Sequence, residues 1–159
     1  MNPAVEFRHL DTPAEQAGAF ALMRVLRPHL DDAKAFVAQL ARQQSESYRL
    51  LAAFRGRHLL GLAGYRHQTN LIYGRFVYVD DLVVDPQAQG QGIGAQLLDA
   101  VRAIARDSDC ARFVLDTGLH MALAQRFYFR NGLLARGMHF VEPLAAPAAS
   151  ASAMREGAR

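Results

Sequence analysis

The sequence contains one cysteine and no long hydrophobic run. Cys110 has no second cysteine with which to form an internal disulfide, and no other residue stands near it at the spacing of metal ligands. A reducing compartment is therefore expected. No apolar stretch approaches the ~18 residues that cross a bilayer, and residues 1–12 lack the basic and then apolar pattern of a signal peptide. The sequence therefore predicts a cytoplasmic protein with no membrane partner.

Lysine is almost absent as well, because 17 arginines stand beside Lys34 alone. The arginines are scattered through the chain instead of forming a basic block, which argues against a nucleic-acid partner. The net charge of +3 still favours an anionic small molecule as ligand. With 159 residues, 51% of them hydrophobic, the chain is predicted to form one folded domain over residues 1–141, followed by a disordered tail rich in Ala, Ser and Pro over residues 142–159.

Hydrophobic periodicity and turn signals predict alternating strands and helices. In the first helix, Thr12, Pro13 and Glu15 fit a capping box, and residues 68–74 are predicted to be a loop. The predicted strands are 5–10, 48–54, 58–66, 75–84, 111–116 and 133–141, and the predicted helices are 12–26, 31–43, 92–106 and 120–132. This order predicts an α/β fold of the α+β type with a mixed sheet.

The segment DPQAQGQGIGAQLLDA, residues 85–100, places three glycines between an apolar strand and a helix. The glycines are Gly90, Gly92 and Gly94. A glycine loop that leads into a helix exposes unpaired backbone N–H groups and the positive end of the helix dipole, which suits a phosphate. A tight turn alone needs only one or two residues with positive φ, so three alternate glycines favour a phosphate site over a simple turn.

Two classes of phosphate ligand fit such a loop, and the first is a dinucleotide such as NAD. GQGIGA matches the loose G-x-G-x-x-A pattern, and Asp116 ends the next strand about where a ribose-binding acid would lie. In that fold the glycines follow the strand almost at once, whereas residues 85–89 intervene here, and the chain supplies too few βα units. The dinucleotide reading is therefore kept as the weaker alternative.

The second class is an acyl-coenzyme A. Residues 89–94, Gln-Gly-Gln-Gly-Ile-Gly, fit Q/R-x-x-G-x-G/A, and here the chain resembles the GCN5-related N-acetyltransferases (GNAT). The spacing A-x3-Y-x3-G-hydrophobic of the family's later helix is also present, at Ala124, Tyr128, Gly132 and Leu133. The resemblance covers about residues 5–141 and implies a GNAT-like mixed, mostly antiparallel sheet with two splayed parallel central strands, flanked by helices.

Two positions depart from the family pattern. Met121 stands where an Asn that helps to hold the coenzyme is frequent, and Gln89 stands where Arg is more frequent. Gln89 would therefore act by hydrogen bonds alone.

The resemblance implies an acetyl-CoA-dependent N-acetyltransferase that moves an acetyl group to a primary amine of a small molecule or peptide by direct attack on the thioester. The pantetheine amides would pair with strand residues 82–84, residues 89–95 would wrap the diphosphate, and the amide of Leu82 or Val83 would polarise the thioester carbonyl. The implied cofactor-binding residues are Leu82, Val83, Val84, Gln89, Gly90, Gln91, Gly92, Ile93, Gly94 and Ala95.

Asp80 and Asp81 interrupt an otherwise apolar strand, and successive strand residues point to opposite faces, so only one of them is predicted to face the acceptor cleft. YVDDLVV resembles the acidic pair of polyamine-type acetyltransferases, which implies Asp80 as the catalytic base, with Asp81 in reserve. A cap or salt bridge at a strand bulge is the alternative. Tyr128 is the proposed general acid, and core packing is its alternative role.

Family analogy places residues 26–30 and the loop 70–73 beside the acceptor, with His120 and His139 as further acceptor-side candidates. The spacing of the histidines predicts no metal site. Dimers are common in the family, so a homodimer is a further expectation. A non-catalytic acyl-CoA-binding module is the competing function, and it would keep the glycine loop without needing Tyr128 or Asp80.

Overall fold

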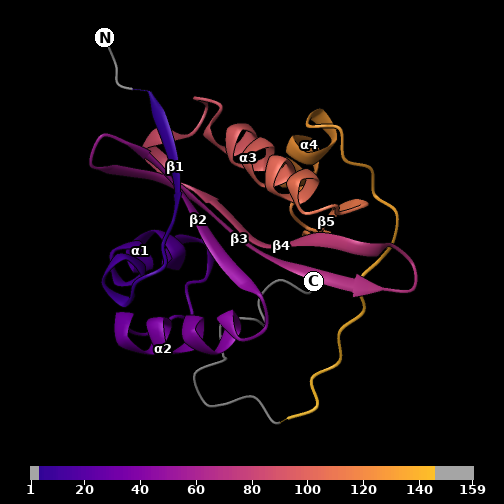
Figure 1. The fold of residues 1–159 in the computed structure, drawn as a ribbon, viewed down its shortest axis with the longest axis horizontal. Coiled ribbons are helices and arrows are strands. Elements are labelled where there is room, and N and C mark those ends of the chain that lie inside the picture. The colour runs from indigo at the N-terminus through magenta and orange to yellow at the C-terminus, as the bar shows by residue number, and fades with distance from the viewer. Residues whose placement is uncertain (1–3, 146–159) are drawn as a thin grey trace.

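In the computed structural model, which describes residues 4–145, the strands form one mixed sheet in the order β1-β2-β3-β4-β5 (Figure 1). The first three pairings are antiparallel, and β4 and β5 are parallel. The strands are β1 Val5–His9, β2 Tyr48–Arg55, β3 His58–Asn70, β4 Gly74–Val84 and β5 Arg112–Leu115. The predicted fold class is confirmed.

Helices cover both faces of this sheet (Figure 1). They are α1 Pro13–Leu26, α2 Ala33–Gln44, α3 Ile93–Asp107 and α4 Ala122–Arg130, with a short 3-10 helix at Pro86–Ala88. The predicted capping box at α1 is confirmed, because the Glu15 N–H donates to the Thr12 hydroxyl and the Thr12 N–H donates to the Glu15 carboxylate at 3.1 Å. Asp32 caps α2, its carboxylate accepting from the Ala35 N–H at 2.8 Å.

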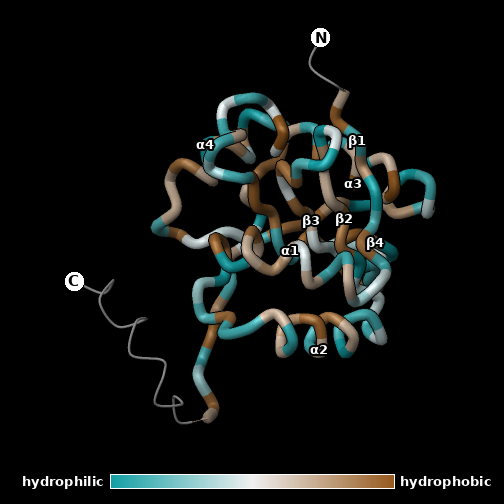
Figure 2. The backbone as a smooth tube through the Cα atoms, turned by 90° about the vertical axis from the view of Figure 1, so that its left-hand side faces the viewer, coloured by the Kyte–Doolittle hydropathy of each residue, from teal (hydrophilic) through white to brown (hydrophobic). Residues whose placement is uncertain are grey.

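The core is divided by the sheet into two layers. On one face, side chains of α1 and α2 such as Met23 and Phe36 share a buried cluster with sheet residues such as Leu62 of β3. On the other face, α3 buries Leu97 and Val101 completely. Figure 2 shows the apolar residues of the sheet lying between the helices. Such a two-sided core fixes the position of each strand relative to the helices.

Two predicted elements are wrong. Residues 133–141, predicted as a last strand, form no strand, and β5 is consequently an edge of the described sheet. The predicted loop 68–74 is largely strand, because β3 extends to Asn70 and β4 begins at Gly74. Only Leu71–Tyr73 form the turn, where the Asn70 carboxamide accepts from the N–H groups of Ile72 and Tyr73.

None of the described helices is long and apolar enough to cross a membrane. Of the predicted tail, residues 146–159 lie outside the described residues, and residues 142–145 have no helix or strand. The domain boundary at residue 141 and the disorder of the tail remain predictions.

Candidate active site

Strand β4 stops pairing with β5 just before Asp80. Its residues Phe76 to Val79 pair with β5, and this pairing stops at Val79, opposite Leu115. From Asp81 to Val84, β4 pairs with β3 only. The two parallel strands therefore separate beyond Val79, as the predicted splay requires. In an antiparallel ladder alternate residues direct their N–H and C=O groups away from the partner strand, so β4 has backbone groups aimed into the gap.

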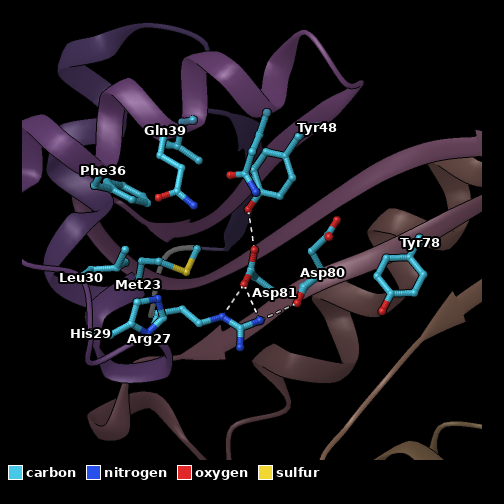
Figure 3. A pocket seen from close by; sticks show the side chains of 12 residues that line it. Met23, Arg27, His29, Leu30, Phe36, Gln39, Tyr48, Tyr78, Asp80 and Asp81 are labelled. Carbon is cyan, nitrogen blue, oxygen red and sulfur yellow. Dashed lines mark hydrogen bonds and ion pairs between the residues drawn. The ribbon is translucent and has the colours of Figure 1, made fainter. Parts of the chain in front are cut away.

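A β-bulge coincides with this separation. In the register of β3 and β4, Gly64 lies opposite Asp81 and Tyr65 lies opposite Val79, so Asp80 is the extra residue. Both carboxylates consequently line the same cavity (Figure 3). The prediction that only one of them faces the cleft is wrong, because a bulge interrupts the alternation of side chains on which it was based.

The cavity lies between β4 and the helices α1 and α2, and its volume is about 380 Å³. Helices α1 and α2 and the segment between them contribute both apolar and polar side chains, and the wall on the side of β4 carries the carboxylates (Figure 3). The lining residues are Met23, Arg27, His29, Leu30, Phe36, Gln39, Leu40, Gln43, Tyr48, Tyr78, Asp80 and Asp81. A volume of this size suits a small molecule or one side chain of a peptide.

Asp81 has both carboxylate oxygens occupied. One accepts from the Arg27 guanidinium, with Nε at 2.9 Å and the second nitrogen at 2.8 Å, and the other accepts from the Tyr48 hydroxyl at 2.8 Å. The same Arg27 donates to the backbone carbonyl of Asp80 at 2.9 Å and so holds the bulge (Figure 3). Burial, followed by the neighbouring Asp81 charge, raises the pKa of Tyr48 well above its ordinary value, so Tyr48 stays a donor.

Asp80 is differently placed. One of its oxygens accepts from Arg66 Nε at 2.9 Å, while the other has no hydrogen-bond partner among residues 4–145. Burial raises the pKa of the Asp80 carboxyl, and the hydrogen bond and charge of Arg66 oppose that rise. Asp80 thus combines a free oxygen with a raised proton affinity.

Tyr78 connects the cavity wall to the end of β5. Its hydroxyl donates to the Asp116 carboxylate, which also lies 3.0 Å from His139 Nδ1. Burial and this hydrogen bond raise the pKa of Tyr78. His139 thus contacts Asp116, which in turn contacts Tyr78 of the cavity wall. The acceptor-side role of His139 stays a prediction.

The glycine loop has the backbone that its sequence predicts. Gly90 and Gly92 have φ values of 76° and 78°, and Gly92 is the N-cap of α3. Gly94 instead lies in the first turn of α3, and a Cβ there would lie 3.1 Å from the Phe127 ring, so a side chain at this position requires the ring to shift slightly. The first helical hydrogen bond runs from Gln96 N–H to Gly92 C=O at 3.1 Å, so the amides of Ile93, Gly94 and Ala95 have no intrahelical acceptor. These residues fit an anionic diphosphate.

An arginine that the sequence did not single out lies beside this loop. Arg55, at the end of β2, donates to the Gln91 carboxamide oxygen at 3.0 Å. Its Nε is buried and has no hydrogen-bond partner among the described residues. Arg55 thus places a positive charge next to the loop in which Gln89 replaces the more frequent arginine.

Tyr128 does not line the cavity that holds Asp80 and Asp81. It lies in α4, beside the Phe127 ring at a centroid distance of 5.3 Å, and α4 approaches the glycine loop through that same ring. Burial raises the pKa of Tyr128, which keeps the phenol protonated at neutral pH.

The predicted acceptor segments have different outcomes. From residues 26–30, the side chains of Arg27, His29 and Leu30 line the cavity. The turn 70–73 contributes no lining residue, and His120 is exposed without lining it. Within the described chain no group of three or more His, Cys, Asp or Glu side chains is arranged to hold a metal ion.

Comparison with known proteins agrees with this geometry. The family model described as Acetyltransferase (GNAT) family matches residues 11–133. An uncharacterized N-acetyltransferase of Bacillus subtilis, YhdJ, is 28% identical over 78% of this chain and 87% of that protein. The aminoalkylphosphonate N-acetyltransferase of Salmonella typhimurium is 29% identical over 89% of this chain and 93% of that protein.

Among solved structures, the aminoglycoside N-acetyltransferase AAC(6')-Iy in complex with CoA has a TM-score of 0.79 at 16% identity, with 91% of this chain and 98% of that chain covered. This likeness supports the fold. Together, the splayed strands and the matched family model define an acyl-transferring enzyme. The chain belongs to the GNAT acetyltransferase family and is an acetyltransferase. The antiparallel pairings of β1 to β4 differ from the parallel sheet on which the dinucleotide alternative depended, and membership of an acetyltransferase family disfavours the non-catalytic module.

Proposed function

We propose that the protein transfers an acetyl group from acetyl-CoA to a primary amine of a small molecule or peptide, by direct attack of the amine on the thioester. The observation that carries the proposal is the position of Asp80, at the residue where β4 leaves β5 and where the bulge turns a carboxylate toward the cavity. The donor site and the acceptor cavity meet at this residue.

The donor site is assigned to β4 and the loop that follows it. Acetyl-CoA, when bound, supplies an activated acyl group on a thioester. Backbone groups of Leu82, Val83 and Val84 would pair with its pantetheine amides, and an amide of Leu82 or Val83 would polarise the carbonyl. The diphosphate would be held by residues 89–95, with Arg55 adding its charge.

Asp80 is assigned as the base. An alkylammonium group has a pKa of ~10.4, about 3 units above pH 7. Converting it to the neutral amine at pH 7 therefore costs about 4 kcal/mol of free energy. The free oxygen of Asp80 would take this proton directly or through one water, and its raised pKa makes it a better acceptor than an exposed aspartate. Asp81, with both oxygens occupied, would instead hold Arg27 and Tyr48 in place.

Tyr128 is assigned as the acid that protonates the departing thiolate. The phenol stays protonated because burial raises its pKa, and no hydrogen bond to another described residue contributes to this shift. For a phenol of ordinary pKa ~10, transfer to a thiolate of pKa ~8.5 is uphill by about 2 kcal/mol, which is small beside the barrier of the reaction. The raised pKa of Tyr128 increases this cost and at the same time keeps the proton available.

The acceptor is proposed to be a small amine. The cavity of about 380 Å³ carries the carboxylate of Asp80 on its wall, opposite apolar side chains such as Met23 and Phe36, and a carboxylate in such a place suits an alkylammonium group. One relative, the aminoalkylphosphonate N-acetyltransferase, is named for a small amine, which supports this proposal. A cytoplasmic location remains a prediction.

The proposal is tested by release of free thiol from acetyl-CoA in the presence of amines, amino acids, peptides and aminoglycosides. We expect acceptor-dependent thiol release that falls about 10²-fold or more in Tyr128→Phe. Phe129→Leu is a matched control, because Phe129 is a neighbouring exposed aromatic of α4. No thiol release with any acceptor would refute the activity, and full activity in Tyr128→Phe would refute the role of Tyr128 alone.

A further inference from the structure

A second cavity lies at the end of α3 opposite to the glycine loop, between that helix and β5. Its volume is about 220 Å³. Helix α3 packs on the sheet face opposite to α1 and α2, so this cavity is separate from the one lined by Asp80 and Asp81. At ~1.5 Å per residue, Arg106 is about 20 Å along α3 from Gly92. The side chains that line this second cavity include those of Arg102, Arg106 and Arg112.

The three arginines come from two elements of the fold. Arg102 and Arg106 are four residues apart on α3 and therefore lie on the same side of the helix, one turn from each other. Arg112 is the first residue of β5, which lies beside α3 (Figure 1). No Asp or Glu side chain of the described residues lines the cavity with them. Three guanidinium groups thus share one small cavity that has no carboxylate in its described wall.

The turn between α3 and β5 fixes the position of Arg112 relative to the helix. The Cys110 N–H donates to the Ala105 carbonyl at 2.9 Å, and the Ala111 N–H donates to the Arg75 carbonyl of β4 at 2.8 Å. One bond ties the turn to α3, and the other ties it to the sheet. The backbone that carries the arginines is therefore held in place before any ligand binds, which lowers the entropic cost of binding.

Arg102 is positioned by its neighbours. Its guanidinium donates to the Asp99 carboxylate at 2.8 Å and to the Asn131 carbonyl, and its Cζ lies 5.4 Å from the centre of the Phe113 ring. Only 20% of the Arg102 side chain is exposed. Phe113 lines the cavity as well and adds an apolar surface to its wall. Arg102 therefore presents a guanidinium group in a fixed position beside an aromatic ring.

Arg106 and Arg112 have no carboxylate partner within residues 4–145. The Arg106 side chain makes no hydrogen bond to a described residue, and the Arg112 side chain donates only to the Ala111 carbonyl, at 2.7 Å. A cation in the last turn of a helix offsets the helix dipole, which explains Arg106 alone. It does not explain Arg112, which lies outside the helix and adds a like charge to the same cavity.

We propose that this cavity binds a phosphate group, either as free phosphate or as the phosphomonoester of a small molecule. A guanidinium group donates two parallel hydrogen bonds to a phosphate, and a dianion offsets the mutual repulsion of the arginines. The volume of about 220 Å³ is below the ~300 Å³ at which pockets for drug-sized ligands begin, so the site suits a small anion. The net charge of +3 attracts such an anion. The proposal goes beyond acetyl transfer and does not depend on it.

The first test is a calorimetric titration of the full chain with inorganic phosphate at constant ionic strength. We expect saturable binding, with a dissociation constant for one bound phosphate that rises at least tenfold in the double variant Arg106→Gln/Arg112→Gln. The matched control is Arg24→Gln/Arg42→Gln, which removes the same charge from exposed arginines of α1 and α2. No saturable binding to the wild type, or equal weakening in both double variants, would overturn the proposal.

The second test locates the phosphate through Cys110, the single cysteine of the sequence, which is partly buried in the wall of this cavity. Saturating phosphate should slow the reaction of its thiol with an uncharged aromatic disulfide reagent at least fivefold. Arg106→Gln/Arg112→Gln should abolish this protection, whereas Arg55→Gln, beside the glycine loop, should leave it unchanged. An unchanged rate at saturating phosphate, or protection that is lost only in Arg55→Gln, would overturn the proposal.

The source of the phosphate group is distinguished by repeating the titration with phenyl phosphate. Tighter binding of phenyl phosphate assigns the cavity to a phosphomonoester whose organic part contacts the Phe113 ring, and tighter binding of inorganic phosphate assigns it to the free anion. Binding of both compounds that is undiminished in Arg106→Gln/Arg112→Gln would overturn the proposal.

Discussion

At the scale of single residues, the two adjacent aspartates have opposite surroundings. Asp81 is bound by Arg27 and Tyr48 through both oxygens, whereas Asp80 keeps one oxygen free toward the cavity. Identical side chains therefore have different assignments, one structural and one catalytic. The bulge brings both carboxylates to the same cavity, and the difference between them arises from the side chains that they meet there.

Asparagine substitutions separate these two assignments. Asp80→Asn should lower kcat/KM about 10²-fold or more, because the base is lost, with little change in the affinity for acetyl-CoA. Asp81→Asn should mainly lower the free energy of unfolding, by about 1–3 kcal/mol, because it weakens the bonds to Arg27 and Tyr48. Steady-state kinetics and denaturant unfolding measure these quantities. A larger loss of activity in Asp81→Asn would reverse the assignment.

The pH dependence of activity follows from the surroundings of Asp80. The base must be ionised, so kcat/KM should rise with pH through the pKa of Asp80 in the free enzyme. Burial raises this pKa and Arg66 lowers it, so Arg66→Gln should move the acid limb of the profile to higher pH. Arg49→Gln, which breaks an exposed ion pair with Asp11, is the control. A shift to lower pH in Arg66→Gln would contradict the role of Asp80.

At the scale of elements, Gly64 in β3 leaves room for the pair of Tyr48 and Asp81. A Cβ at Gly64 would lie 1.8 Å from the Tyr48 hydroxyl and 2.9 Å from the Asp81 carboxylate. Tyr48 is only 1% exposed, so its ring has little space into which it can move. The bulge, the tyrosine and the glycine therefore form one packed unit at the base of the site.

Gly64→Ala should lower the free energy of unfolding by about 1–3 kcal/mol through overpacking. Tyr48→Phe removes the nearest atom, so the double variant should be less destabilised than the sum of the two single variants. Gly18→Ala is the matched control, because a Cβ at Gly18 in α1 meets nothing within 4 Å and alanine favours a helix. Additive effects in denaturant unfolding would show that Gly64 has no steric coupling to Tyr48.

Local signals in the sequence were sufficient for most elements. The cap at Thr12 and the glycines before α3 act within a few residues, so their structural consequences could be read directly. The alternation in residues 133–141 could not reveal whether a partner edge exists, and the predicted strand is absent. Likewise, the bulge at Asp80 is a property of the pairing with β3, which no single segment encodes.

The contacts of the site were harder to predict, because they join distant positions. Arg27 precedes Asp81 by 54 residues and Arg55 precedes Gln91 by 36 residues. Several of the chain's arginines have no evident role, so composition alone does not select these two. The family resemblance identified the glycine loop and Asp80 as site residues. The residues that contact them, Arg27 and Arg55, could be identified only from the fold.

At the scale of the whole molecule, the proposed donor site, in the gap between β4 and β5, and the cavity lined by Asp80 and Asp81 share the strand β4. Side chains of β4 belong to both core layers, so the strand is packed on both faces. Acetyl-CoA should bind this preformed gap and stabilise the folded chain. At about 100 times its dissociation constant it should add about 2.7 kcal/mol, seen as a rise in Tm, whereas NAD should add nothing. Stabilisation by NAD alone would contradict the assignment of the loop.

The most direct test of the donor site is a crystal structure of the complex with coenzyme A. This assignment predicts the diphosphate within hydrogen-bond distance of the amides of residues 89–95, and the pantetheine beside Leu82, Val83 and Val84 with its sulfur end toward Asp80. A diphosphate bound elsewhere on the molecule, or a pantetheine that avoids the gap between β4 and β5, would contradict it.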